Sequence, residues 1–439
     1  MAAVVSAALA PGLAPAGVFN PAYTKLANGL EVVVIENRRV PAVIQMLWYK
    51  VGATDEAPGE SGAAHFFEHL MFKGTEKHPP DEFSAFVRRH GGFENAFTSP
   101  DQTGYYQVVQ KDQLEQIMAF EADRMTGLTL TQEQIESERA VVLEEWNERV
   151  GASPAAQLGA AMYSAMFRNH NYGRPIIGWR HEILELDRET LLAFYRRYYA
   201  PDNAVLVIAG DVDSEAAFAL AEKHYGNIPA SNNPPAKWTR EPPSRAPRTV
   251  TLTDERVSDP SWRRMYLAPS DNTEGREHVL ALDILSDILG DRSVGRLARN
   301  IVRKDRIALA AGAYYNGSRR GPATFSFYAT PHADQTLEAV EAAIEAEIAN
   351  VLENGVTEEE VEATKKRMLS AAVFARDDLE TGARIFGRTL ANGGTIDDVE
   401  KWPEMLAEVT ADDVKRAAAL VFKPERSVTG LLLPKETTQ

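Results

Sequence analysis

Three residues whose side chains can work on a metal ion stand close together in the first part of the chain. Residues 65–69 read His-Phe-Phe-Glu-His. On a helix, positions i, i+3 and i+4 lie on one face, so His65, Glu68 and His69 project together. Two imidazoles one turn apart can bind one zinc ion, and the carboxylate between them can take a proton from a water on that ion. The spacing therefore predicts a zinc site that activates water.

The order of these residues and their neighbours favours a metal site over a chance grouping. H-x-x-E-H reverses the common H-E-x-x-H signature of zinc proteases. The flanking residues, Ala63-Ala64, Phe66-Phe67 and Leu70-Met71-Phe72, are apolar enough to be buried. Each polar group left unpaired there would cost about 1–3 kcal/mol, and a bound metal removes that cost. Ser61 is placed to cap this helix, and Lys73-Gly74 to end it.

A catalytic zinc site takes three protein ligands, so a third must come from elsewhere in the chain. Thr131 and Gln134 form a capping-box pattern, which predicts a helix from there to about Val150. Acidic residues are frequent along this helix, and most acidic residues on helices are only solvated. Spacing alone leaves the third ligand open among three carboxylates: Glu144, Glu145 and Glu148.

The run from Gly62 to Thr75 resembles the zinc helix of the pitrilysin/insulinase family, the inverzincins. It is most similar to the branch that contains the mitochondrial processing peptidase β-subunit and its bacterial relatives. The family's third ligand is a Glu in a Val-Leu-x-Glu segment, which Val142-Leu143-Glu144-Glu145 matches. The resemblance implies one Zn²⁺ per chain, bound by His65, His69 and Glu145. It also implies that Glu138 supports the site from the outer shell.

The activity implied by this resemblance is hydrolysis of peptide bonds. Zinc lowers the pKa of its water from about 16 towards about 7. Glu68, which is not expected to be a ligand, would accept that water's proton and pass it to the leaving amine. The family's substrate-edge segment matches four residues that would pair with the peptide as an added strand. They are Asn95, Ala96, Phe97 and Thr98.

One departure from the family pattern concerns substrate binding. Complete enzymes of the family carry an Arg and a Tyr, seven positions apart, in the second half of the chain. Arg303 matches the first, but Ala310 stands at the second and cannot donate a hydrogen bond. Either the chain is a weak monomeric enzyme, or another subunit supplies the pair. We expect a heterodimer with a homologous subunit that carries both residues.

The organisation of the chain predicts an α+β fold of two similar domains, each a mainly antiparallel sheet flanked by helices. Prolines cluster in a linker over residues 229–248, between a catalytic domain over 21–228 and a non-catalytic domain over 249–439. Each half closes with a helix, a proline and an apolar strand, which indicates an internal duplication. Those closing strands are Ala204–Gly210 and Ser427–Leu433.

The second half lacks the chemistry of the first. Where it should carry the zinc helix, residues 277–289 contain a single histidine, His278. We therefore expect one active site per chain.

Composition narrows the class of protein and its location. Lys and Arg total 47 against 63 Asp and Glu, a net charge of −16, which disfavours nucleic-acid binding. Cysteine is absent, so disulfides are excluded.

Residues 1–20 form an Ala/Pro-rich arm that resembles a signal-peptide core, with an exit at Ala14-Pro15-Ala16. This favours the periplasm, with the cytoplasm as the alternative. We expect no stable membrane insertion, because Pro11 and Pro15 interrupt the arm and no other stretch could cross a membrane.

Two other functions compete with a peptidase. A structural or assembly subunit of the same family would have little activity of its own, although such subunits typically lose the zinc residues that this chain keeps. The second is a zinc hydrolase that acts on non-peptide substrates. Only the peptide-binding edge, which the resemblance implies, argues against it.

Overall fold

The computed structural model describes residues 17–234 and 236–435, so most of the arm expected over residues 1–20 lies outside it. The first half contains β1 (Ala22–Lys25), β2 (Glu31–Glu36), β3 (Ala42–Tyr49), α1 (Ala63–Leu70), α2 (Glu82–Arg89), β4 (Phe93–Thr98), β5 (Thr103–Gln110), α3 (Leu114–Thr126), α4 (Gln132–Trp146), α5 (Pro154–Met166), α6 (Arg180–Glu185), α7 (Arg188–Tyr198), β6 (Ala204–Gly210) and α8 (Ser214–Tyr225). The second half contains β7 (Arg248–Asp254), β8 (Ser261–Ala268), α9 (Val279–Gly290), β9 (Ala308–Tyr315), β10 (Ala323–Pro331), α10 (Leu337–Asn354), α11 (Glu358–Ala375), α12 (Leu379–Ala391), α13 (Ile396–Glu400), α14 (Trp402–Glu408), α15 (Ala411–Val421) and β11 (Ser427–Pro434).

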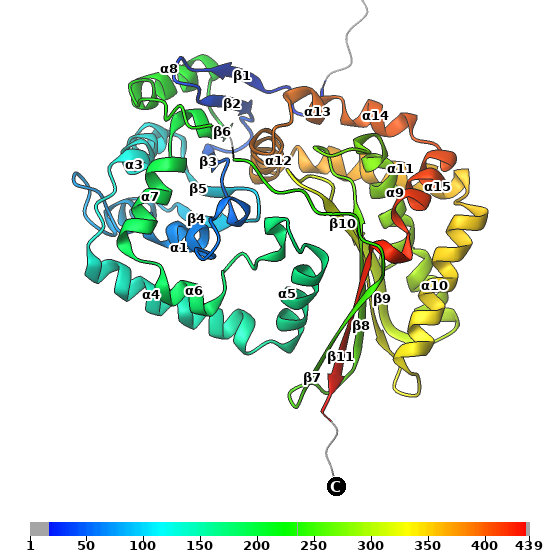
Figure 1. Cartoon of the computed structure of the whole chain (residues 1–439). Helices are drawn as coiled ribbons and strands as arrows, with labels where there is room; N and C mark the ends of the chain where they lie inside the picture. Colours follow the sequence, from blue (N-terminus) through cyan, green and yellow to red (C-terminus); the bar gives the residue numbers. More distant parts are fainter. Residues whose placement is uncertain (1–16, 235, 436–439) are drawn as a thin grey trace, which may run out of the picture.

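Apart from the extra edge strand β1 of the first sheet, the two halves share one sheet topology, which confirms the predicted α+β fold of two similar domains. The first sheet has the order β1-β2-β6-β3-β5-β4 and the second has β7-β11-β8-β10-β9. The closing strand of each half, β6 or β11, is parallel to one neighbour and antiparallel to the other. The remaining pairs are antiparallel. The helices before both closing strands, α7 and α15, also lie where the duplication predicted them (Figure 1).

Helices cover both faces of each sheet, and one covering helix in each case comes from the other half. Helices α1, α3, α7 and α8 bury one face of the first sheet, and α9, α10 and α15 bury one face of the second. The other face of the first sheet packs against α12, through Phe386 and Leu390. The other face of the second packs against α5, through Leu158 and Met162. Figure 1 shows both helices beside these sheets.

This exchange has a consequence for the domain boundaries. Between the end of α8 and the start of β7 the described residues form no helix or strand, in keeping with an extended Pro-rich linker. However, α5 and α12 each complete a core on the far side of that linker. The boundaries at residues 228 and 249 stay a proposal, and neither half buries both faces of its sheet alone.

Candidate metal centre

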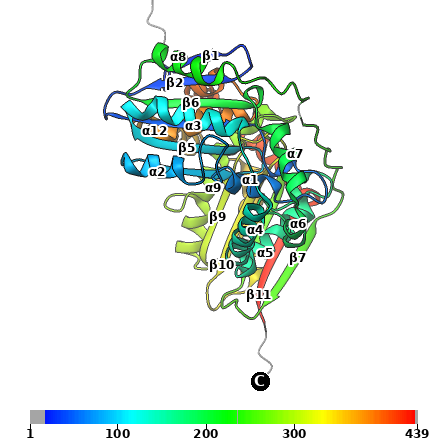
Figure 2. The same ribbon diagram turned by 90° about the vertical axis from the view of Figure 1, so that its left-hand side faces the viewer.

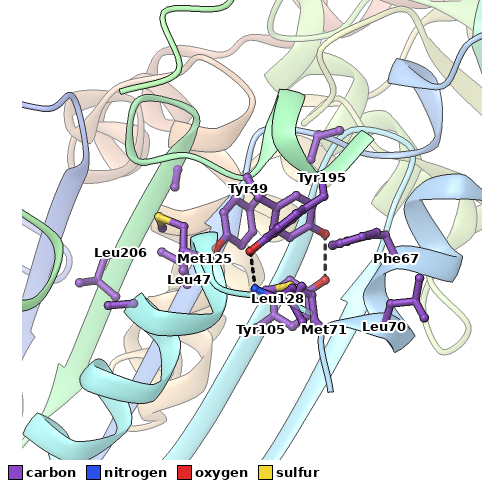
Figure 3. Close-up of a cluster of buried hydrophobic side chains, with 14 of the residues drawn as sticks. Leu47, Tyr49, Phe67, Leu70, Met71, Tyr105, Met125, Leu128, Tyr195 and Leu206 are labelled. Atoms are coloured by element: carbon purple, nitrogen blue, oxygen red, sulfur yellow. Dashed lines mark hydrogen bonds between the residues drawn. The ribbon is translucent and has the colours of Figure 1, made fainter. Parts of the chain in front are cut away.

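Helix α1 presents the inverted motif on one face and is anchored by its other face. Phe67 and Leu70 are fully buried, and the Phe67 ring points toward Tyr195 (Figure 3). The Phe67 ring stacks on Tyr195 with centroids 5.0 Å apart. The apolar side chains of α1 thus anchor the helix in the core. This packing fixes the direction in which the motif side chains project.

The start of α1 differs from the prediction that Ser61 caps it. The cap is Gly62, at φ 91°, where a Cβ atom would lie 2.7 Å from the carbonyl oxygen of Ile177. Glu56, which is buried and eight residues earlier in the sequence, accepts a hydrogen bond from the backbone N–H of Ala64 at 2.9 Å. The Ser61 hydroxyl instead accepts from the backbone N–H of Trp179. The prediction that Ser61 caps α1 was wrong because its hydroxyl binds the backbone of Trp179, while the nearby carboxylate of Glu56 binds the helix end.

Helix α4 carries the remaining acidic residues to the site. Its capping box of Thr131 and Gln134 is present as predicted, and the α-helix runs to Trp146 before a π-helical turn over Asn147–Gly151. Figure 2 shows α1 and α4 side by side. Glu138 and Glu145 both face the motif of α1, so the seven-residue spacing places them on one side of the helix.

Three ligand atoms converge between these two helices. Oε2 of Glu145 lies 3.5 Å from Nε2 of His65 and 3.2 Å from Nε2 of His69. All three atoms lie within 4.8 Å of one another. Tetrahedral zinc with bonds of about 2.0–2.1 Å separates its ligand atoms by about 3.3 Å. The donor set therefore fits a zinc ion, and of Glu144, Glu145 and Glu148 it is Glu145 that joins the two histidines.

The surrounding charges act differently on the two ligands Glu145 and His69. A hydrogen bond to His65 lowers the pKa of Glu145 to about 2, with help from Arg149, which pairs with its other oxygen at 2.9 Å. Burial lowers the pKa of His69, but the hydrogen bond and charge of Glu138 outweigh it and raise the pKa. Glu145 is thus ionised near neutral pH, as metal binding requires, whereas a metal bound at Nε2 of His69 must displace the proton that the raised pKa favours.

Glu138 lies behind His69 in the position expected for an outer-shell carboxylate. Its Oε1 accepts a hydrogen bond from Nδ1 of His69 at 2.9 Å, and its Oε2 pairs with Lys73. Burial raises the pKa of Glu138, but the bonds from His69 and Lys73 bring it below its usual value. A carboxylate so placed sets the orientation of the imidazole and leaves Nε2 free for a metal.

Replacing Glu138 should therefore weaken zinc binding without abolishing it. For Glu138→Ala we expect a 10- to 100-fold rise in the zinc dissociation constant, about the usual effect of losing such a partner. Competition with a chromophoric chelator measures it. Glu136→Ala is the matched control, because Glu136 is exposed on the same helix and bonds only to Gln132 among the described residues. Equal affinities in both variants would contradict the role of Glu138.

Glu68 lies beside the ligand cluster and is held by the predicted substrate edge. Thr98, at the end of β4, donates a hydrogen bond from its hydroxyl to Oε2 of Glu68 at 2.5 Å. Glu68 is not part of the group of converging metal ligands. Its Oε1 forms no hydrogen bond with any described residue. The arrangement leaves one carboxylate oxygen to exchange a proton.

A cavity of about 1010 Å³ joins the metal centre to the substrate edge. It is lined by the motif residues, by Glu138 and Glu145, and by the four predicted edge residues Asn95, Ala96, Phe97 and Thr98. These four belong to β4, which is an edge strand of the first sheet. One long side of the strand is therefore without a partner strand. Their contact with substrate stays a prediction.

Arg303 is the predicted site residue that the fold does not bring to this cavity. It is exposed at the end of a π-helical turn over Ala298–Lys304, and Ala310 is exposed on the edge strand β9. Neither lines the cavity. Within one chain the remnant of the Arg/Tyr pair therefore stands apart from the metal centre, and the substrate contact of Arg303 stays a prediction.

Several cavity residues were missed from the sequence. Helix α5 turns Ala156, Gly159 and Tyr163 toward the cavity. Tyr172 lines it from a 3-10 turn over Asn171–Gly173, and Arg319 lines it from a loop. A Cβ atom at Gly159 would meet no atom within 4 Å, so this wall is open. No sequence pattern marks the small residues of α5 as cavity residues, because only tertiary packing shows which face of that helix is free.

Comparison with known proteins agrees with the geometry. A family model described as insulinase (peptidase family M16) matches residues 31–179, which include His65, Glu68, His69, Glu138 and Glu145. A second model, described as the peptidase M16 inactive domain, matches residues 185–368. The chain belongs to peptidase family M16. The inactive-domain match lies mostly in the half that lacks the inverted motif, although it begins within the first half.

Individual M16 relatives cover almost the whole chain. The zinc protease PqqE of Helicobacter pylori is 28% identical over 412 residues, which are 93% of this chain and 92% of the relative. An uncharacterized zinc protease of Mycobacterium leprae is 29% identical and covers 90% of this chain and 88% of its own. The crystal structure of a protease from H. pylori superposes with a TM-score of 0.88 at 27% identity, covering 94% of this chain and 100% of that one.

A more distant M16 structure is about twice as long. The periplasmic protease PqqL of Escherichia coli matches with a TM-score of 0.79 and 20% identity, over 96% of this chain but only 48% of that protein. At this identity the likeness concerns the fold alone. The fold of this chain thus corresponds to half of the PqqL chain.

Proposed function

We propose that this chain is the zinc-bearing subunit of an endopeptidase that cleaves peptides or unfolded segments. The observation that carries the proposal is the convergence of His65, His69 and Glu145 in a cavity whose wall continues as an edge strand. Metal ligands, a carboxylate outside the ligand group and an open strand edge are the parts that peptide hydrolysis needs. Relatives named zinc proteases support the same reaction class.

The residues divide the chemistry among themselves. When bound by His65, His69 and Glu145, zinc supplies a Lewis acid and lowers the pKa of water to about 7. Glu68 accepts the proton of the attacking water at Oε1, the oxygen that Thr98 does not bind, and returns it to the leaving amine. The Thr98 bond limits rotation of the Glu68 side chain, so the same oxygen serves both transfers.

We propose that the substrate binds to β4 as an added strand. Asn95, Ala96, Phe97 and Thr98 lie along this edge, and Thr98 contacts Glu68 directly. Backbone pairing along a strand positions a peptide without demanding one sequence. The substrate must then be extended over several residues, which favours peptides and unfolded segments over folded proteins.

We further propose that the active form is a heterodimer with a homologous subunit that carries the Arg/Tyr pair. Ala310 cannot donate a hydrogen bond to the developing oxyanion, and neither Ala310 nor Arg303 lines the cavity. The correspondence of this chain with half of PqqL supports a two-part chamber.

Reconstitution with the partner subunit tests both the endopeptidase activity and the heterodimer. Adding the partner to the zinc-loaded chain should raise turnover of a peptide library by about 100- to 1000-fold, the usual effect of one oxyanion donor. The same partner added to Glu68→Gln chain serves as the control for activity of the partner itself. Full turnover without a partner would reject the heterodimer. A zinc-loaded complex that cleaves no peptide would favour the structural subunit, and ester hydrolysis without peptide hydrolysis would favour a non-peptide hydrolase.

We propose a periplasmic location, with the cytoplasm as the alternative. The supporting feature is the signal-like composition of residues 1–20, of which 1–16 lie outside the described residues. Among the helices that the structure describes, none is both long and apolar enough to cross a bilayer. Fractionation of the source cells tests the location, and recovery with cytoplasmic markers would reject it.

A further inference from the structure

The loop between β9 and β10 reaches from the second half of the chain into the first half, beside the metal centre. Arg320 of this loop pairs with buried Asp55 at 2.5 Å and donates to the backbone carbonyl of Lys50 at 3.1 Å. The backbone N–H of Gly321 donates to the hydroxyl of Tyr172 at 2.9 Å. These buried polar contacts fix the loop, and with it the position of the preceding residue, Arg319.

The side chain of Arg319 lies over Tyr172 at the cavity wall. Its guanidinium carbon is 5.3 Å from the centre of the Tyr172 ring. Tyr172 is buried, and its hydroxyl donates to Oδ1 of Asp101 at 2.6 Å, so the ring is a rigid platform. A cation–π contact of this kind holds the guanidinium against the ring and leaves its N–H groups to bind other groups.

Arg319 differs from the other cations that line the cavity. Lys73 pairs with Glu138, and Arg149 pairs with Glu145. Arg174 donates to the backbone carbonyls of Glu56 and Ala57. For Arg319 no hydrogen bond or ion pair of the side chain occurs within the described residues. A fixed, half-buried guanidinium with its N–H groups unused is suited to bind an anion from outside.

We propose that Arg319, stacked on Tyr172, forms a subsite that binds a carboxylate of the peptide substrate. The inference rests on the proposed peptidase function and adds a specificity to it. The planar guanidinium matches the two oxygens of a carboxylate, and such charge-assisted pairs are stronger than neutral hydrogen bonds. The carboxylate comes either from an Asp or Glu side chain or from the C-terminus of a short peptide.

Peptide binding to the zinc-loaded Glu68→Gln chain tests this proposal without turnover, with the partner present if one co-purifies. The probes are fluorescent neutral peptides in which one Glu moves along the sequence, each with a Gln counterpart, and each with a free or amidated C-terminus. At one position, or at the free C-terminus, the carboxylate should tighten binding by about 10-fold. If peptides with Glu show the preference, the carboxylate comes from a side chain. If peptides with a free C-terminus show it, the carboxylate comes from the C-terminus.

Substitution of Arg319 then decides the assignment. In Arg319→Gln the preference should fall below about 2-fold, and in Arg319→Lys it should be intermediate, because lysine keeps the charge but not the planar fork. Arg292→Gln, an exposed arginine without an ion pair among the described residues, should keep the full preference. Unchanged far-UV spectra and melting temperatures show that the variants are folded.

Two outcomes would overturn the proposal, and they are distinguishable. An unchanged carboxylate preference in Arg319→Gln, or no preference in the parent chain, rejects the subsite while peptide binding stands. Failure of the zinc-loaded parent chain to bind any peptide rejects the proposed function, and the subsite falls with it.

Discussion

Glu68→Gln should lower peptide hydrolysis by about 1000-fold and leave zinc binding intact. General base catalysis contributes about 10²–10⁴ in rate, and 1000-fold corresponds to about 4 kcal/mol of transition-state stabilisation. Glutamine keeps the shape of the side chain and can still accept the bond from Thr98, but it cannot take a proton. Steady-state kinetics with parallel metal analysis measure both quantities.

The control for this variant is a glutamate outside the site. Glu76 is exposed, so Glu76→Gln should keep full activity and full zinc content. If Glu68→Gln hydrolysed peptides at the parent rate, Glu68 would not be the base. If the variant lost zinc, Glu68 would belong to the ligand set, contrary to its place outside the converging group.

Glu145→Ala should abolish both zinc binding and activity. The substitution removes the oxygen that lies between the two imidazoles, and two histidines alone leave the three-ligand set of catalytic zinc sites incomplete. We expect less than one tenth of the parent zinc content after dialysis, and hydrolysis at the level of the chelated parent enzyme. Metal analysis and peptide cleavage measure these effects.

Glu144→Ala provides a matched control at the neighbouring position. Glu144 is exposed on the same turn and bonds only to Asn147 among the described residues. It should bind zinc like the parent chain. Loss of zinc in Glu144→Ala with retention in Glu145→Ala would reverse the ligand assignment, and loss in both would point to damage to α4.

Local patterns in the chain predicted the parts of the site that depend on one helix at a time. The spacing of His65, Glu68 and His69 places them on one face because a helix repeats every 3.6 residues. Thr131 and Gln134 form their capping box through contacts three residues apart. Such features depend on neighbours in sequence, so the residue types alone define them.

The choice among acidic residues on α4 needed the other helix. Glu144, Glu145 and Glu148 are alike in type and lie within one helical turn or so of each other. Only the packing of α4 against α1 shows that Glu145 meets both histidines. Resemblance to a family chose Glu145, the carboxylate that meets both histidines, where the physical chemistry of the segment left three options open.

The residue pattern alone predicted the zinc ligands on α1, the duplicated α+β design and a single inverted motif. Packing between the two halves placed α5 and α12 on each other's sheets and brought Arg319 to the cavity. The physical reason is the range of the interactions. Helix faces and strand alternation follow from backbone geometry between near neighbours. Contacts between residues more than a hundred positions apart depend on how all the elements pack at once.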